Sequence, residues 1–284
     1  MTSLVLSVQS HVAAGCVGNR AAVFTLERLG HGVAAVHTLQ FSNHLGHGAA
    51  TGTVFPHAEV RAVLEGTLDH LGKRRIDALL TGYLGAAENA EAAVAAAQRI
   101  RTGNPEAFWL CDPVMGDLGR LYVGEALVET YRGAAAAAAD VLTPNAFELE
   151  ILSGRPVEGP ETALAAARSL LGPRTRLVVA TSLPGPGPGE ISNLAVTAEG
   201  AWLLTTPLLP FAPPPSGSGD VFAALLCDQL LRATPMPEAL GRVGNALYAV
   251  LEATLAAQAP EVDLVGAQGL LLEAPQRFAV TKVD

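Results

Sequence analysis

Between residues 213 and 222, a proline-rich loop changes into glycines and then into an apolar helix, in the order Pro-Pro-Pro-Ser-Gly-Ser-Gly-Asp-Val-Phe. We expect the backbone amides of Gly217, Ser218 and Gly219 to point outward at the start of that helix, with the positive end of its dipole behind them. Such a turn can hold an anion, most naturally a phosphoryl group during its transfer. Asp220 follows directly and could act as a base, although an acid that only caps the helix would look the same.

Two more carboxylates stand where buried strands are expected to end. Asp112 begins the run Asp-Pro-Val-Met-Gly-Asp, and Thr143 begins Thr-Pro-Asn-Ala-Phe-Glu, which places Glu148 in a first helical turn. Carboxylates at this edge of a parallel sheet suit a Mg²⁺ ion that also binds phosphates. Each could instead be a cap, since Asn with Glu three residues later resembles a capping box, and Asp117 could bind the metal or close a turn with Gly119. Together with the glycine turn, they favour metal-assisted phosphoryl transfer.

Short, almost continuously apolar runs alternate with helical patterns, which is typical of strands buried on both faces of a parallel sheet. The predicted parallel strands are residues 4–10, 33–39, 78–83, 108–112, 141–143 and 177–180. The predicted helices between them are residues 21–29, 57–71, 87–101, 124–132 continued by the alanine run 134–139, and 161–171. This order predicts an α/β fold with a central, mostly parallel sheet and helices on both faces.

The segment 193–206 departs from this alternation. Residues 194–197 and 201–206 form two extended runs around Ala-Glu-Gly, which predicts a hairpin at the edge of the sheet. Two long helices are predicted after it, over residues 220–231 and 237–257. Because the chain contains no long linker, we expect one α/β domain over residues 1–284.

Composition excludes several classes of protein. The net charge of −9 argues against a nucleic-acid surface, which would need clustered Lys and Arg. Only Lys73 and Lys282 are lysines, and neither is placed to hold an aldehyde cofactor as a Schiff base. Three widely spaced cysteines favour a reducing, cytoplasmic location. The apolar run 4–8 follows no positive residue and is not interpreted as a signal segment, and no apolar stretch of about 18 residues predicts a membrane span.

Several motifs together resemble the ribokinase-like superfamily and, within it, the pyridoxal kinase family. The glycine turn before Asp220 and the Asn-x-x-Glu segment ending at Glu148 are typical of the superfamily. The Gln-Ser-His of residues 9–11 and the Phe-Ser-Asn-His of residues 41–44 are similar to pyridoxal kinases in particular. With Thr-Gly-Tyr-Leu-Gly at residues 81–85, the resemblance extends over nearly the whole chain.

The resemblance implies a Mg²⁺- and ATP-dependent kinase in which Asp220 is the base and the turn amides stabilise the transferred phosphoryl group. It implies that pyridoxal is phosphorylated on its 5'-hydroxyl, in a homodimer, with a K⁺ requirement left open. Asp112 and Glu148 would hold the metal. The implied substrate-binding residues are Ser10, His44, Leu45, Gly46, Tyr83 and Asp220. The implied ATP-binding residues are Asp112, Thr143, Glu148, Thr181, Thr206, Pro207, Leu208 and Leu209.

Two positions depart from the family pattern. Thr181 stands where bacterial relatives often carry a lysine, and Leu45 with Gly46 replaces a polar pair beside the substrate. The glycine-rich segment 41–52, with His44 and His47, is predicted to fold over the substrate as a lid. A kinase of hydroxymethylpyrimidine would share the fold, base and metal, and a non-catalytic protein that binds vitamin B6 would share the pocket. Both stand as alternatives to a pyridoxal kinase.

Overall fold

Ten strands form one sheet in the computed structural model, which describes residues 2–72 and 75–283. The strand order is β12-β11-β10-β9-β8-β5-β4-β1-β2-β3. Strands β9, β8, β5, β4, β1 and β2 are parallel, and β3, β10, β11 and β12 are antiparallel to their neighbours. The bounds are β1 Leu4–Val12, β2 Gly32–Phe41, β3 Gly52–Val54, β4 Ala78–Thr81, β5 Phe108–Cys111, β8 Val141–Leu142, β9 Leu177–Pro184, β10 Glu190–Val196, β11 Ala201–Pro207 and β12 Val280–Val283, with a separate ribbon of β6 Gly116–Asp117 and β7 Arg120–Leu121.

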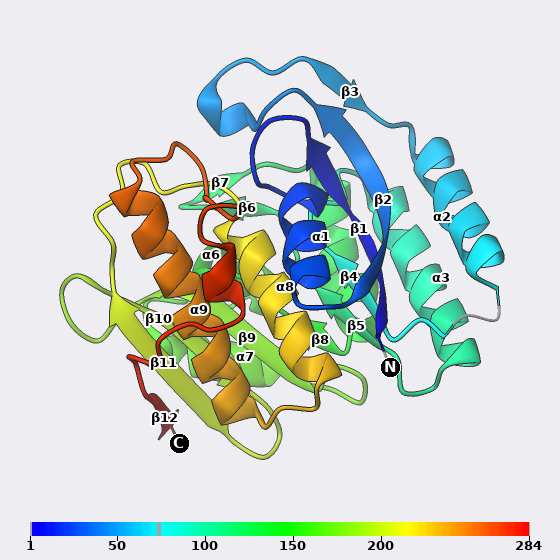
Figure 1. Ribbon diagram of the computed structural model, residues 1–284. Coiled ribbons are helices and arrows are strands. Elements are labelled where there is room, and N and C mark those ends of the chain that lie inside the picture. The colour runs from blue at the N-terminus through cyan, green and yellow to red at the C-terminus, as the bar shows by residue number, and fades with distance from the viewer. Residues whose placement is uncertain (1, 73–74, 284) are drawn as a thin grey trace.

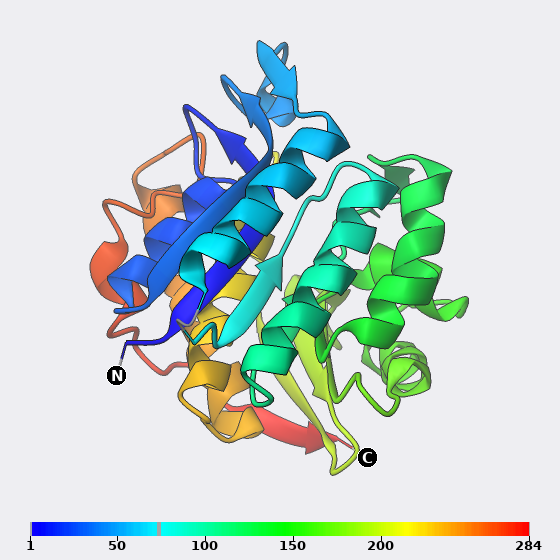
Figure 2. The ribbon, with the colours of Figure 1, turned by 90° about the vertical axis from the view of Figure 1, so that its right-hand side faces the viewer.

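Helices cover both faces of the sheet (Figures 1 and 2). Helices α1, α8 and α9 pack on one face, where Leu26, Phe222 and Leu240 join one buried cluster, and α2, α3, α4, α6 and α7 pack on the other. Within the described residues, no helix has the length and apolarity needed to cross a membrane. The bounds are α1 Asn19–Arg28, α2 His57–Leu71, α3 Ala87–Gly103, α4 Glu125–Thr130, α5 Ala136–Ala138, α6 Ala146–Ser153, α7 Pro160–Leu170, α8 Ser218–Leu231 and α9 Met236–Ala256, with short turns η1 Leu45–His47, η2 Tyr131–Ala135 and η3 Gln268–Leu271.

Strand β1 shows why the central strands form. Val5, Leu6 and Val8 are fully buried; Val5 belongs to the cluster beneath α1 and α8, and Leu6 and Val8 belong to the cluster on the opposite face. Successive side chains of a strand point to opposite faces, so both sides of β1 must be apolar. Each fully buried side chain of this kind contributes about 1.5–3 kcal/mol. The six predicted parallel strands, and a mostly parallel sheet with helices on both faces, are confirmed.

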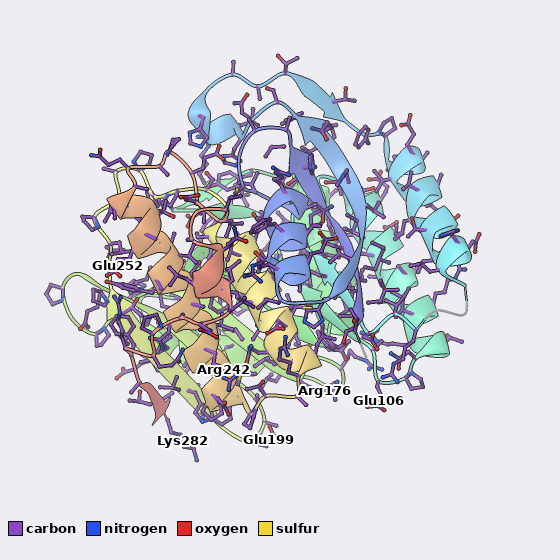
Figure 3. The ribbon with its side chains drawn as sticks, viewed as in Figure 1. Glu106, Arg176, Glu199, Arg242, Glu252 and Lys282 are labelled. Atoms are coloured by element: carbon purple, nitrogen blue, oxygen red, sulfur yellow. The ribbon has the colours of Figure 1, made fainter. Side chains whose placement is uncertain are left out.

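The hairpin predicted within residues 193–206 is present as β10 and β11, but it is not the outermost part of the sheet. Strand β12 pairs with β11 and forms that edge. Like β3 and the β6–β7 ribbon, β12 is too short to carry a strand pattern of its own, and only its pairing partner makes it a strand. Lys282 is exposed on β12, as Figure 3 shows, whereas Lys73 lies outside the described residues.

The alanine run is helical as predicted, through the π-helical turn η2 and then α5. It ends at Asp140, which is 1% exposed. Asp140 accepts a hydrogen bond from the Trp109 N–H at 2.8 Å and pairs with Arg101 and Arg174. This buried carboxylate joins β5, the end of α3 and the approach to β9, so it stabilises the core far from the carboxyl edge of the sheet.

Candidate active site

The residues predicted to do chemistry gather at the carboxyl edge of the parallel strands, where ligands bind in wound sheets. Ser10 lies near the end of β1, Tyr83 follows β4, Asp112 follows β5 and Thr143 follows β8. The N-terminus of α8 reaches the same edge, because Asp220 there bonds to the loop that follows β1. Figure 1 shows the blue segment from β2 to β3 above this edge.

The glycine turn has the geometry that its sequence predicts. Helix α8 begins at Ser218, and Gly217 is its N-cap residue with φ of 96°. A Cβ built on Gly217 would lie 1.9 Å from the carbonyl oxygen of Cys16, so both the backbone angle and the space require glycine. Side chains of the described residues make no capping hydrogen bond to this helix, which leaves the amides of Ser218 and Gly219 available to an anion.

Asp220 lies in the first turn of α8, where its Oδ2 accepts a hydrogen bond from the Gly18 N–H at 2.8 Å. Gly18 has φ of 55°, and a Cβ there would lie 2.5 Å from Ser10 Oγ, so Gly18 lies directly between Ser10 and the Asp220 carboxylate that it bonds. Asp220 keeps some contact with solvent, yet the protein around its carboxyl raises its pKa to about 6, and the Gly18 hydrogen bond opposes that rise. Such a carboxylate is ionised at neutral pH and more basic than an ordinary Asp, which suits a general base.

Asp112 lies beside the glycine turn. A Cβ built on Gly219 would lie 3.8 Å from Asp112 Oδ2. Burial raises the pKa of Asp112 well above its usual range, the charges of Glu148 and Asp220 raise it further, and the nearby Thr143 hydroxyl lowers it. That hydroxyl is buried and makes no hydrogen bond within the described residues. Buried acidic groups whose charges raise the pKa of a neighbour favour a bound cation.

Glu148 is buried, and its carboxylate organises the loop after β5. Oε1 accepts hydrogen bonds from the N–H groups of Met115 and Gly116 at 2.9 and 3.4 Å, and Oε2 accepts one from the Asn145 N–H at 3.0 Å. Asn145 Oδ1 accepts the Glu148 N–H at 2.9 Å, which completes a capping box on α6. Burial raises the pKa of Glu148 to about 7, and the three backbone hydrogen bonds oppose that rise. Glu148 therefore caps α6 and also lies near Asp112.

Asp117, for which two roles were open, closes the turn between β6 and β7. Its Oδ1 accepts the Leu118 N–H at 2.8 Å, and Asp117 pairs with Arg120 across the turn. Leu118 and Gly119 both have positive φ, of 48° and 79°, as a two-residue hairpin turn requires.

His44 joins the predicted lid to the glycine turn. Its Nδ1 accepts the Gly46 N–H at 3.1 Å and lies 3.0 Å from the hydroxyl of Ser216. Because a backbone amide only donates, Nδ1 is unprotonated and the ring proton of His44 is assigned to Nε2. Burial lowers the pKa of His44, and the neighbouring His47 lowers it further, which favours this neutral ring. Leu45 is 62% exposed, so most of its side chain lies in solvent.

The remaining predicted residues lie at the same edge of the sheet. Tyr83 is half-buried after β4, and burial raises its pKa. The Thr181 N–H donates to the Pro144 carbonyl at 2.9 Å, which places Thr181 beside Thr143 and its neighbours. Thr206 is buried near the end of β11, two strands beyond β9, while Pro207 and Leu208 are exposed and Leu209 is half-buried. The described hydrogen bonds do not join these four residues to the glycine turn.

The sequence matches the phosphomethylpyrimidine kinase family over residues 13–262. It is 43% identical over 287 residues to pyridoxal kinase PdxY of Deinococcus radiodurans, with 99% of this chain and 96% of the relative covered. It is 46% identical over 287 residues to pyridoxal kinase PdxY of Rubrobacter xylanophilus, with 98% and 97% covered. The chain belongs to the pyridoxal kinase family. The resemblance found in its motifs is thereby confirmed.

A solved pyridoxal kinase has the same fold. The pyridoxal kinase of Leishmania donovani, in complex with ADP and pyridoxamine, matches this structure with a TM-score of 0.92 at 31% identity. The match covers 99% of this chain and 100% of the other. The ribokinase-like α/β fold expected from the motifs is therefore confirmed.

Two residues of this pyridoxal kinase family member contact the candidate site without having been predicted to do so. Gly18 was not predicted as a site residue, although a glycine shortly after a strand can signal a close backbone approach. Glu261 carries no such signal, because it stands in an irregular loop after α9, and only the fold brings it to Cys16.

Proposed function

We propose that this protein transfers the γ-phosphate of ATP to the 5'-hydroxyl of pyridoxal, which forms pyridoxal 5'-phosphate and ADP, and that it serves in vitamin B6 salvage. Pyridoxine and pyridoxamine are proposed as further acceptors. The observation that carries the proposal is Asp220, a carboxylate with a pKa of about 6 held by the Gly18 N–H at the free amide end of α8. Relatives named pyridoxal kinase, similar over nearly the whole chain, support the choice of alcohol.

In the proposed reaction, Asp220 accepts the proton of the 5'-hydroxyl while that oxygen forms a bond to the γ-phosphorus. The bond from this phosphorus to the oxygen bridging to the β-phosphate breaks, and ADP leaves with the electron pair. The turn amides, Gly217 included, stabilise charge on the phosphoryl group, and the enzyme contributes mainly position and electrostatics. Ser10, which packs against the Gly18 that bonds Asp220, orients the ring, and His44, which lies 3.0 Å from Ser216, brings the lid over it.

Mg²⁺ is the proposed metal, and the residues present fit it. Asp112 and Glu148 are buried oxygen donors, and the charge of Glu148 raises the pKa of Asp112, a repulsion that a cation would relieve. In the described part of the chain, no group of three or more His, Cys, Asp or Glu side chains is arranged to hold a metal alone. Mg²⁺ commonly binds one or two carboxylates, with phosphates and water completing its shell. Bound there, it would neutralise charge on the phosphates of ATP.

A kinetic panel tests the proposal. Purified protein is given ATP with pyridoxal, pyridoxine, pyridoxamine or hydroxymethylpyrimidine; ADP release is measured for every alcohol, and pyridoxal 5'-phosphate is followed by its absorbance in the pyridoxal arm. The phosphomethylpyrimidine kinase family match and the exposed Leu45 make the pyrimidine alcohol the informative rival. Turnover of the pyrimidine alone refutes the substrate, and binding of pyridoxal without ATP consumption refutes the kinase. Parallel arms with a chelator and with K⁺ in place of Na⁺ test the cations, and sedimentation tests the proposed homodimer.

A further inference from the structure

Glu261 lies in the loop between α9 and η3, far along the chain from the residues of the proposed reaction. Its neighbours Val262 and Leu264 are 2% and 1% exposed, and the Asp263 N–H donates to Thr254 Oγ1 at 3.1 Å. Figure 1 shows this loop, coloured orange to red, passing beside the blue loop that follows β1. The carboxylate of Glu261 is therefore carried by a segment that is anchored on the core and on α9.

The two carboxylate oxygens of Glu261 contact two different segments. Oε2 accepts the Cys16 N–H at 2.9 Å, and Oε1 lies 3.2 Å from Nε2 of His47 in η1. A Cβ built on Gly15, whose φ is 113°, would lie 2.1 Å from Oε2, so a glycine is needed for this approach. The side chain of Glu261 is only 17% exposed, which shields both contacts from the solvent screening that weakens surface ion pairs.

Both segments continue directly to the proposed catalytic groups. Two residues beyond Cys16, the Gly18 N–H donates to Asp220 Oδ2 at 2.8 Å. On the lid, His44 lies 3.0 Å from Ser216, the residue before the glycine turn. Glu261 thus contacts both the loop after β1 and the lid. The first of these segments bonds to Asp220, and the second contacts the residue before the anion-binding amides.

We propose that Glu261 is a positioning residue for phosphoryl transfer. It holds the loop after β1, and through that loop the Gly18 amide that orients Asp220, and it holds His47 so that the lid stays over the substrate. The inference rests on the function proposed above and adds a residue that does not touch the substrate. Loss of the carboxylate frees both segments at once, so kcat and the KM for pyridoxal both change. In the described structure, Glu261 is not bonded to the proposed ATP contacts, so the KM for ATP stays the same.

Steady-state kinetics of Glu261→Ala and Glu261→Gln test this role. We expect Glu261→Ala to lower kcat about 100-fold, the loss typical of a catalytic group displaced by ~1 Å. Its KM for pyridoxal should rise about tenfold, as for one lost hydrogen bond to a charged group, and its KM for ATP should stay within about twofold. Glu261→Gln should restore most of kcat, because its amide oxygen can accept the Cys16 N–H while its NH₂ donates to a retautomerised His47.

Glu252→Ala is the matched control. Glu252, labelled in Figure 3, lies on α9. It pairs with Arg277 at 2.7 Å, and 43% of its side chain is exposed. Its removal should leave kcat and both KM values as in the wild type, since the pair lies outside the proposed site. A Glu261→Ala enzyme with constants within about twofold of wild type overturns the inference, as does a Gln variant no better than the Ala variant.

Amide hydrogen exchange gives a readout that needs no turnover. Peptides covering residues 13–18 and 41–52 should exchange faster in Glu261→Ala than in the wild type or in Glu252→Ala. Unchanged exchange in both peptides overturns the inference. If the wild-type protein phosphorylates no alcohol, the proposed function fails, and the exchange data still decide whether Glu261 ties these two segments.

Discussion

Replacing Asp220 by Asn should abolish most turnover and at the same time stabilise the protein. The amide oxygen of Asn can still accept the Gly18 N–H that now bonds Oδ2 at 2.8 Å, so ligand binding should be retained. An amide cannot take the proton of the alcohol, and loss of a general base typically lowers the rate about 10²–10⁴-fold. The gain in stability is expected because the substitution removes a negative charge whose burial destabilises the folded protein.

The size of that gain follows from the pKa of Asp220, raised by burial from its ordinary 3.8 to about 6. Well below pH 4 the carboxyl is protonated in both the folded and the unfolded chain, so it does not affect stability. Between about pH 4 and pH 6 the unfolded chain ionises while the folded chain keeps its proton, so stability falls over this window, and above pH 6 the loss is complete. One pKa unit corresponds to ~1.4 kcal/mol, so the full effect is about 3 kcal/mol, and the partial solvent contact of Asp220 lowers it to about 1–2 kcal/mol.

The assay is urea denaturation of the wild type and the Asn variant at pH 7.5 and pH 4, beside initial rates with Mg-ATP and pyridoxal. Asp69→Asn is the control, because Asp69 is 71% exposed and its pair with Arg99 should change stability by less than about 1 kcal/mol. A variant that keeps more than about a tenth of the wild-type turnover would remove Asp220 from the role of base. Equal stability of the wild type and the variant at pH 7.5, or an equal gain at both pH values, would refute the argument from burial.

Three further predictions concern pH, the glycine turn and the core. Below about pH 6, kcat/KM should fall about tenfold per pH unit as Asp220 is protonated, and a rate profile flat down to about pH 5 would contradict this. Gly217→Ala should lower kcat at least ~100-fold, because its Cβ would lie 1.9 Å from Cys16 O and displace the turn. Gly30→Ala is its control for backbone strain alone, because Gly30 has φ of 93° and open space around it. Asp140→Ala should lower the free energy of unfolding by about 3–5 kcal/mol in urea with unchanged KM values, since the largely buried Arg101 and the Trp109 N–H lose the carboxylate that they bond; a loss below about 1 kcal/mol would refute that role.

The parallel strands were predictable because burial on both faces leaves a long apolar run in the sequence. Leu6 and Val8 on one face and Val5 on the other make the first half of β1 apolar on both sides, with Ser7 as a buried polar residue that bonds to Asn19. Strand β12 was not predictable, because four residues ending in Lys282 and Val283 carry no such run. Its pairing with β11 is a long-range contact, and short edge strands are defined by contacts of that kind.

The candidate site also contains features that the sequence predicts and features that it does not. The glycine turn could be predicted because its chemistry is local: a glycine with φ of 96°, free amides and an acid all fall within four consecutive residues ending at Asp220. The capping box of Glu148 was predictable for the same reason. Its second role, as the acceptor of hydrogen bonds from the loop after β5, was not. Met115 and Gly116 lie more than thirty residues away in the chain, and only the packing of α6 against the loop after β5 brings their amides to Oε1.

The sequence by itself determined the order of the parallel strands and the long helices, the anion-binding turn and the carboxylates at strand ends, because each depends on neighbouring residues or on a repeating apolar pattern. Only the tertiary structure decided that Gly18 holds Asp220, that the site environment raises the pKa of Asp220 to about 6, and that Glu261 contacts both Cys16 and His47. Such properties depend on how much water the folded chain excludes and on which distant segments it brings together. Neither can be predicted from a pattern of neighbouring residues.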